Sequence, residues 1–256
     1  MSHKTSHRAQ SGFTLVELMV ALVIGLFITA GLVTLVQAMK RTTTSQAGLS
    51  QLQDNERMAM NLVTNAVQSA GYYPNPKTTS ASTYFTAISP AQSYSGGQTM
   101  VAGQSIAGQH GVSTYDALVL RYTSAGNDGI INCAGGTVTA LTTWTQTLTL
   151  DGNGNLECII YDGTNTTTVM LVSGITNFQV QYGVQTNAAA AYNSVDTYLT
   201  ADLMTAAYWG RLRSVVVTLW FTNPLAGQPG QSSGNAGTTI PFSRAVTVMN
   251  KTGVDT

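Results

Sequence analysis

The sequence predicts an α+β fold in which one long N-terminal helix packs on an antiparallel β-sheet head. Three observations predict it. An uncharged apolar run stands near the N-terminus, an amphipathic stretch follows it, and alternating segments separated by Gly, Asn and Asp fill the rest of the chain. The 256 residues are enough for one or two domains.

The composition argues against a nucleic-acid binder, because Lys plus Arg and Asp plus Glu number 11 each and leave no net charge. Charged residues make up 9% of the chain, whereas about 25% is usual. Thr, Ser, Gln, Asn and 25 Gly replace them. This composition is typical of an extracytoplasmic, β-rich protein.

The apolar run Leu18–Val36 has 19 residues and no charge. As a helix it is about 28 Å long, which matches a hydrocarbon core of about 30 Å. It therefore predicts a membrane span. The alternative is a secretory signal cleaved after Ala38, although the run is longer than such signals usually are. Basic residues on its two sides nearly balance and do not fix its orientation.

The helix is expected to continue beyond this run. Apolar residues recur there at three- and four-residue steps, as one buried stripe requires: Leu49, Leu52, Ala59, Leu62, Val63, Ala66, Val67 and Ala70. Gly71 is a suitable C-terminal cap, and two prolines follow it. One helix over Thr14–Ala70 is therefore predicted. A break within Thr42–Gly48 is the alternative, because three adjacent threonines have poor helix propensity.

The head is predicted to contain an exposed, variable region followed by strands. Asn75 to Gly111 is rich in Ser, Thr, Gly, Gln and Ala, and is long for a structureless loop. Asp151–Asn155 and Asp162-Gly163 are hairpin signals. Seven segments alternate as half-buried strands do: Asp116–Thr123, Thr145–Leu150, Leu156–Tyr161, Thr166–Val172, Asn177–Val184, Arg213–Thr222 and Ile240–Met249.

Glu17 does not fit a plain anchor, because a carboxylate at membrane depth costs a few kcal/mol unless it is paired or interfacial. The dipole of a helix N-terminus offers one explanation. However, Ser11–Leu18 (SGFTLVEL) follows a short basic leader and resembles the processing site of type IV prepilins. The resemblance implies cleavage between Gly12 and Phe13 by a membrane-embedded prepilin peptidase, N-methylation of Phe13, and Glu17 as the fifth residue of the mature chain.

These residues suit that chemistry. Gly12 has no side chain, so the backbone at the scissile bond can approach a protease cleft. Processing gives Phe13 a cationic amine, which Glu17 of the same or a neighbouring subunit can neutralise during assembly. The major subunits of this family usually carry a proline where this chain has Thr34, so a minor subunit is predicted.

The head resembles the PilW family of type IV pilus assembly. The matching pieces are Asp116–Tyr122, Asn155–Cys158, Leu171–Gly183 and Leu212–Leu219. Residues 76–111 and 223–237 are unmatched, and the leader alone is shared with type II secretion pseudopilins. The resemblance implies a type IV pilin-like fold with a leader at 1–12, a helix at 13–71 that spans the membrane at about 15–37, and a head at 72–256.

Cys133 and Cys158 are the only two cysteines, which rules out a four-cysteine zinc site and a CxxC pair. They are either two buried thiols or one disulfide. The oxidising periplasm that the resemblance implies favours the disulfide.

The sequence lacks signs of catalysis. His3 and His7 lie in the leader, so His110 alone remains for a triad or a metal site. Asp151–Asn155 with Asp162 has partial calcium-loop spacing, but Leu stands where that loop needs Gly, so a hairpin turn is preferred. No enzymatic activity, cofactor or metal is expected. Core and rim packing, rather than a binding surface, is expected for Tyr72, Tyr73, Trp144, Trp209 and Trp220.

The expected function is that of a minor pilin, acting in pilus assembly or priming and thereby in twitching motility, adhesion or DNA uptake. Its expected partners are other minor pilins, the major pilin, the inner-membrane assembly platform and the prepilin peptidase/N-methyltransferase, with no nucleic acid bound directly. It is expected in the inner membrane with a periplasmic head, and then in the pilus. The alternatives are a minor pseudopilin of type II secretion and a ligand-binding tip adhesin that uses the loop 75–111.

Overall fold

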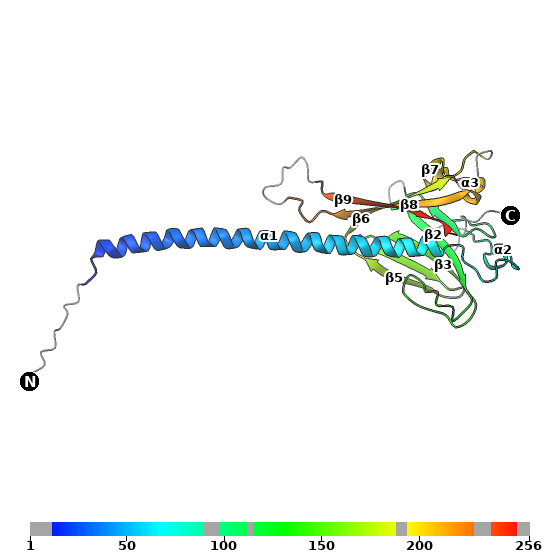
Figure 1. Ribbon diagram of the computed structural model, residues 1–256, viewed down its shortest axis with the longest axis horizontal. Coiled ribbons are helices and arrows are strands. Elements are labelled where there is room, and N and C mark those ends of the chain that lie inside the picture. Colours follow the sequence, from blue (N-terminus) through cyan, green and yellow to red (C-terminus); the bar gives the residue numbers. More distant parts are fainter. Residues whose placement is uncertain (1–11, 90–97, 112–114, 188–193, 228–236, 250–256) are drawn as a thin grey trace, which may run out of the picture. The chain divides into compact units, whose positions relative to one another are not determined.

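The computed structural model describes residues 12–89, 98–111, 115–187, 194–227 and 237–249. The chain divides into two compact units, Met1–Leu49 and Ser50–Thr256. The boundary falls inside helix α1 (Leu15–Ser69), which Figure 1 colours from blue to cyan. The second part of α1 therefore belongs to the same unit as the strands.

Helix α1 confirms the predicted single helix to within a residue at each end. No break occurs at Thr42–Gly48. The hydroxyls of Thr42 and Thr43 donate to the carbonyls of Ala38 and Met39 at 3.1 and 3.0 Å, so both side chains bond within the helix. Gly71 adopts a φ of +81° directly after the helix, and its N–H donates to the carbonyl of Arg121 at 2.8 Å.

All seven predicted strands are present, and every strand pair is antiparallel. They form two sheets together with two short strands that the sequence did not predict. The five-stranded sheet has the order β1-β2-β3-β4-β5: Ile106–Gln109, Ala117–Ser124, Thr142–Leu150, Leu156–Tyr161 and Thr166–Val172. The four-stranded sheet has the order β7-β6-β8-β9: Thr197–Leu199, Ile175–Val184, Leu212–Thr222 and Thr239–Thr247.

The chain passes from the first sheet to the second through only two residues, Ser173 and Gly174, between β5 and β6. Gly174 has a φ of +84°, which turns β6 away from pairing with β5. Three short helices complete the described fold: α2 (Ala81–Tyr84), η2 (Ala201–Leu203) and α3 (Ala206–Gly210).

The second part of α1 supplies one wall of the head's core. Of the predicted stripe, Leu49 and Leu62 are only partly buried, and Met60 is buried although it was not predicted. The buried side chains of the helix are Leu52, Ala59, Met60, Val63, Ala66 and Val67. Side-chain hydrogen bonds hold the helix to the link between the two sheets and to the second sheet. The Asn55 amide donates to the carbonyl of Ser173 at 3.3 Å, and Arg244 of β9 donates to Asn61 at 3.2 Å.

The prediction of an exposed loop over Asn75–Gly111 is confirmed only in part for the residues that the structure describes. Most of 75–89 is exposed, but buried residues and strand β1 also lie in this segment, and residues 90–97 lie outside the description. Phe85 and Met100 are fully buried, and Ile88 is 6% exposed. Ile88 pairs with Met100 through two backbone hydrogen bonds of 2.8 and 3.1 Å. A few buried apolar residues are enough to hold this polar segment against the head. They are too widely spaced to give a periodic pattern, so the sequence did not predict their burial.

Candidate functional site

The N-terminal residues that the leader motif singles out lie open to solvent. Phe13 is 84% exposed. Gly12 is also exposed, and no atom lies within 4 Å of the position that a Cβ on it would take. The peptide bond between Gly12 and Phe13 is therefore accessible to a protease in the described part of the chain.

Glu17 occupies the first turn of α1, three residues after Thr14. The Thr14 hydroxyl accepts a hydrogen bond from the Glu17 N–H at 3.3 Å, and the Thr14 carbonyl accepts one from the Leu18 N–H at 3.2 Å. Thr14 is thus the N-cap, and Thr-Leu-Val-Glu has the spacing of a capping box. Sequence reasoning missed this capping role of Thr14, although the T-x-x-E spacing is visible in the sequence.

The part of α1 that follows Glu17 presents apolar side chains on every side. From Leu15 to Val36 every residue is exposed, with Phe27 at 76% and Leu26 at 69%. Its length and composition suffice to cross a membrane. After Glu17 the next charged residue in the sequence is Lys40. Glu17 is therefore the one carboxylate associated with this apolar surface.

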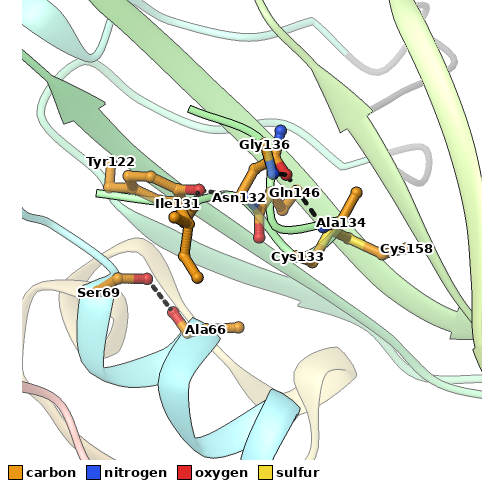
Figure 2. Close-up of a disulfide and its surroundings, with 10 residues drawn as sticks. All are labelled: Ala66, Ser69, Tyr122, Ile131, Asn132, Cys133, Ala134, Gly136, Gln146 and Cys158. Atoms are coloured by element: carbon orange, nitrogen blue, oxygen red, sulfur yellow. Dashed lines mark hydrogen bonds between the residues drawn. A yellow bond between two sulfur atoms is a disulfide. The ribbon is translucent and has the colours of Figure 1, made fainter. Parts of the chain in front are cut away.

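The predicted disulfide between Cys133 and Cys158 is confirmed, with the sulfurs 1.98 Å apart and the Cα atoms 6.5 Å apart. Figure 2 shows it joining β4, which carries Cys158, to the loop between β2 and β3, which carries Cys133. The Asn132 side chain shapes that loop by accepting from the backbone N–H groups of Ala134 and Gly136 at 3.0 and 2.8 Å.

A buried polar pair, Tyr122 and Gln146, holds the same loop through the carbonyl of Ile131 (Figure 2). The Tyr122 hydroxyl donates to the carbonyl of Ile131 at 3.1 Å and accepts from the Gln146 amide. Burial raises the pKa of Tyr122, so it stays a neutral donor. A cleft of about 300 Å³ lies between this loop and the Leu62–Ser69 stretch of α1. The disulfide loop therefore faces the second part of the helix across this cleft.

Arg121 anchors the segment before β1 and was not singled out by the sequence. It is 2% exposed, and its guanidinium donates to the carbonyls of Thr86, Val101 and Gln104 and lies 5.4 Å from the ring centre of Phe85. Backbone carbonyls and an aromatic face thus stabilise the buried cation. A lone arginine in an apolar strand gives no signal of this role, because its partners are main-chain atoms far along the chain.

His110 contributes to a contact between the two sheets. Its Nδ1 lies 2.9 Å from a carboxylate oxygen of Asp116, which is 3% exposed. The other carboxylate oxygen accepts from the N–H of Val180 in β6 at 2.7 Å. Asp116 therefore links the ends of β1 and β2 to the second sheet, which gives Asp116 and His110 a structural role.

Trp144 and Trp209 pack as predicted, in separate aromatic pairs, whereas Tyr72 is 42% exposed. Trp144 meets Tyr122 with ring centres 5.3 Å apart, and Trp209 meets Tyr182 at 4.8 Å, both edge to face. Trp220 lines a groove of about 1100 Å³ together with Thr147 and Thr149.

The Asp151–Asn155 segment is the turn between β3 and β4, as predicted. Backbone N–H groups of Asn153 and Asn155 donate to the Asp151 carboxylate at 2.8 Å each. With its side-chain partner Asn155, these bonds hold the pKa of Asp151 below its usual value. Among the residues that the structure describes, no group of three or more His, Cys, Asp or Glu side chains is arranged to hold a metal.

Comparison with known families gives two matches. Residues 7–33 match the prokaryotic N-terminal methylation motif, and residues 134–253 match the type IV pilus-assembly protein W family, PilW. A comparison with curated proteins finds no match.

The two matches cover the two units of the chain separately. The first contains Gly12, Phe13, Glu17 and the start of the exposed apolar helix, which together indicate a membrane-anchored pilin. The second contains β3 to β9 and Cys158, which make up most of the strand-bearing part of the chain. Together the two matches support a PilW-like minor pilin with a role in type IV pilus assembly.

Proposed function

We propose that the first part of α1 holds this minor pilin in the inner membrane with its head in the periplasm. The prepilin peptidase then cleaves it between Gly12 and Phe13 and methylates Phe13. The mature chain subsequently joins other minor pilins, the major pilin and the assembly platform in a priming complex or pilus. The observation that carries the proposal is the methylation-motif match over residues 7–33, which includes most of the uncharged, exposed helix surface that follows Glu17.

Processing is tested by the mass of the mature protein. Mature chain is expected to begin at Phe13 with one added methyl group, and to lack the first 12 residues of the gene product. A bulky residue at Gly12 is expected to block cleavage, whereas Gly12→Ala is tolerated in part because Ala is small. A chain that keeps its leader, or one cut after Ala38, contradicts the proposal.

Glu17 is proposed to act in assembly rather than in insertion. In the bilayer its carboxylate can reach the headgroups, so replacing it leaves insertion intact. In a fibre core the methylated amine of a neighbour's Phe13 is surrounded by apolar side chains, and an unpaired buried charge costs several kcal/mol. Glu17 is the carboxylate nearest to that amine along the sequence, because the next acid is Asp54.

The capping-box geometry requires a control, because Glu17 can also stabilise the helix start. Gln keeps capping ability and removes the charge, whereas Ala removes both. We expect Glu17→Gln and Glu17→Ala to be processed, to stay in the membrane fraction, and to fail equally to enter sheared pili. Normal assembly of Glu17→Gln with failure of Glu17→Ala assigns the role to capping and rejects charge pairing.

The pilus role extends to twitching motility, adhesion or DNA uptake, as these depend on assembled pili. Deletion of the gene is expected to reduce surface pili and twitching zones together. The type II pseudopilin and the tip adhesin are not favoured by the family matches. Co-purification of the full-length protein from membranes distinguishes the pilus from the type II secretion machine. Pilus subunits are expected in the complex, and secretion components are not.

A further inference from the structure

The four edge strands of the two sheets are protected to different degrees. In the first sheet, β1 is only four residues long. In the second, β7 has three residues. The longer edge β9 carries an exposed Pro241, and its Arg244 reaches across to α1. Short length, proline and charge are the usual devices that prevent an edge from pairing with another chain.

Strand β5 has none of these devices. Its seven residues, TTTVMLV, contain no charge, proline or glycine, and it pairs only with β4 among the described strands. Successive side chains point to opposite faces of a strand. Thr166, Thr167 and Thr168 are nevertheless all exposed, so both faces of this part are uncovered. Met170 is 64% exposed as well.

The ladder with β4 is regular over the exposed part of the strand. Pairs run without a shift from Thr166–Tyr161 to Met170–Glu157, and the irregularity falls only near Val172. The free edge therefore presents regularly spaced backbone N–H and C=O groups over five residues. Thr and Val favour the extended conformation, so the strand is already in the state that a pairing partner needs.

We propose that the free edge of β5 is a docking site for an extended, uncharged segment of another pilin subunit, which adds a strand to the five-stranded sheet. Main-chain hydrogen bonds supply the binding, and the exposed Thr and Met170 side chains supply the contacts on the two faces. This inference rests on the proposed assembly role, because it places the partner among the other subunits.

A second copy of this chain fits less well. Two β5 strands paired antiparallel are related by a half-turn about the sheet normal. The Ser50–Ser69 part of α1 runs along the sheet, from the contact of Asn55 with Ser173 to that of Gly71 with Arg121. A half-turn reverses its direction in the second copy. Two heads that point in opposite directions do not fit one assembly whose subunits share a direction, so an antiparallel pair of copies is disfavoured and the proposed partner is a different subunit.

The test uses full-length protein in membranes of the native host. A photo-crosslinking residue at Thr168 is expected to form an adduct with another pilin subunit. The double variant Thr166→Lys/Thr168→Lys places charges on the edge and is expected to lower co-purification of that subunit by roughly tenfold or more. The matched control Ala245→Lys/Thr247→Lys, with two exposed positions at the same spacing on β9, is expected to co-purify as the wild type does.

Each outcome decides the inference. An unchanged melting temperature of both double variants shows that the head is intact. Equal co-purification of the β5 variant and wild type overturns the docking site while the assembly role stands. An adduct only with a second copy also overturns it. Wild-type protein that co-purifies with no other pilin subunit overturns the assembly role itself, and the docking site with it.

Discussion

The first part of α1, residues 15–49, and its second part, residues 50–69, form one helix but bury their apolar side chains differently. All six buried residues of the helix lie in the second part, in the stripe that includes Ala59 and Val63. In the first part, Leu22, Phe27 and Val33 are more than half exposed.

This difference identifies what each part needs. A helix that is apolar all round is stable when something surrounds it, such as lipid or other helices. The first part therefore depends on the membrane or on neighbouring subunits, whereas the second part is stabilised by its own head. Substitutions of the same residue type are therefore expected to lower the stability of the head when they fall in the second part, and to leave it unchanged when they fall in the first.

The largest expected effect comes from Met60→Ala. Met60 is 1% exposed, so truncation leaves a cavity and lowers the free energy of unfolding of the head by about 2–5 kcal/mol. Met19 is 58% exposed, and Met19→Ala is expected to leave that value unchanged. Denaturant unfolding of detergent-solubilised protein, followed by fluorescence, reads the head alone because all three Trp residues lie in it. Equal effects of the two substitutions contradict the comparison.

The next effect is that of Cys158→Ser. The disulfide closes a sequence separation of 25 residues, and its loss is expected to lower head stability by about 3 kcal/mol in the chain-entropy model. Native, unreduced wild-type protein should give no free-thiol labelling. The first part of α1 contains no cysteine, so its helix content does not depend on the disulfide. Circular dichroism of a fragment over 13–49 in micelles measures that helix content. Two labelled cysteines in the wild type would refute the bond.

Replacing a glycine by alanine is expected to have smaller effects, which differ between the head and the first part of α1. A Cβ at Gly108 in β1 overlaps the hydroxyl of Tyr182, so Gly108→Ala is expected to destabilise the head by about 1–3 kcal/mol. Gly31, in the first part of α1, has no atom within 4 Å of the position that a Cβ on it would take. Gly31→Ala is therefore expected to raise helix content in micelles, since Gly costs about 1 kcal/mol relative to Ala. Lower melting of the head in Gly31→Ala contradicts this.

The smallest effect is acid sensitivity. The N–H groups of Thr186 and Asn187 donate to the Asp196 carboxylate at 2.9 to 3.1 Å, and they lower its pKa from 3.8 to about 2. A lowered pKa gives a stabilising contribution that is present above the unfolded value and is lost as the pH falls through about 2. The melting temperature of the head is expected to fall between about pH 4 and 2. Asp196→Asn should flatten that fall, and a slope identical to wild type rejects the assignment.

Several features could be predicted because they depend on local pattern. The bounds of β4 and β5 match the alternating segments to the residue, since Asp, Gly and Asn turns mark both ends. The strands β1 and β7 were missed because three or four residues carry no measurable period. The capping role of Thr14 is also a local feature, because the spacing of Thr14 and Glu17 marks a helix start.

The sequence by itself determined the long helix, the seven longer strands and the leader motif, because each rests on near neighbours in the chain. The disulfide between Cys133 and Cys158 was favoured only with the oxidising periplasm that the family resemblance implies. Only the tertiary structure decided the division into two sheets, the burial of Phe85 and Met100, and the contacts of Arg121 with Thr86 and Gln104. Those features depend on main-chain groups from distant segments meeting in space. A backbone carbonyl is the same in every residue, so nothing in the sequence marks the one that will accept a given hydrogen bond.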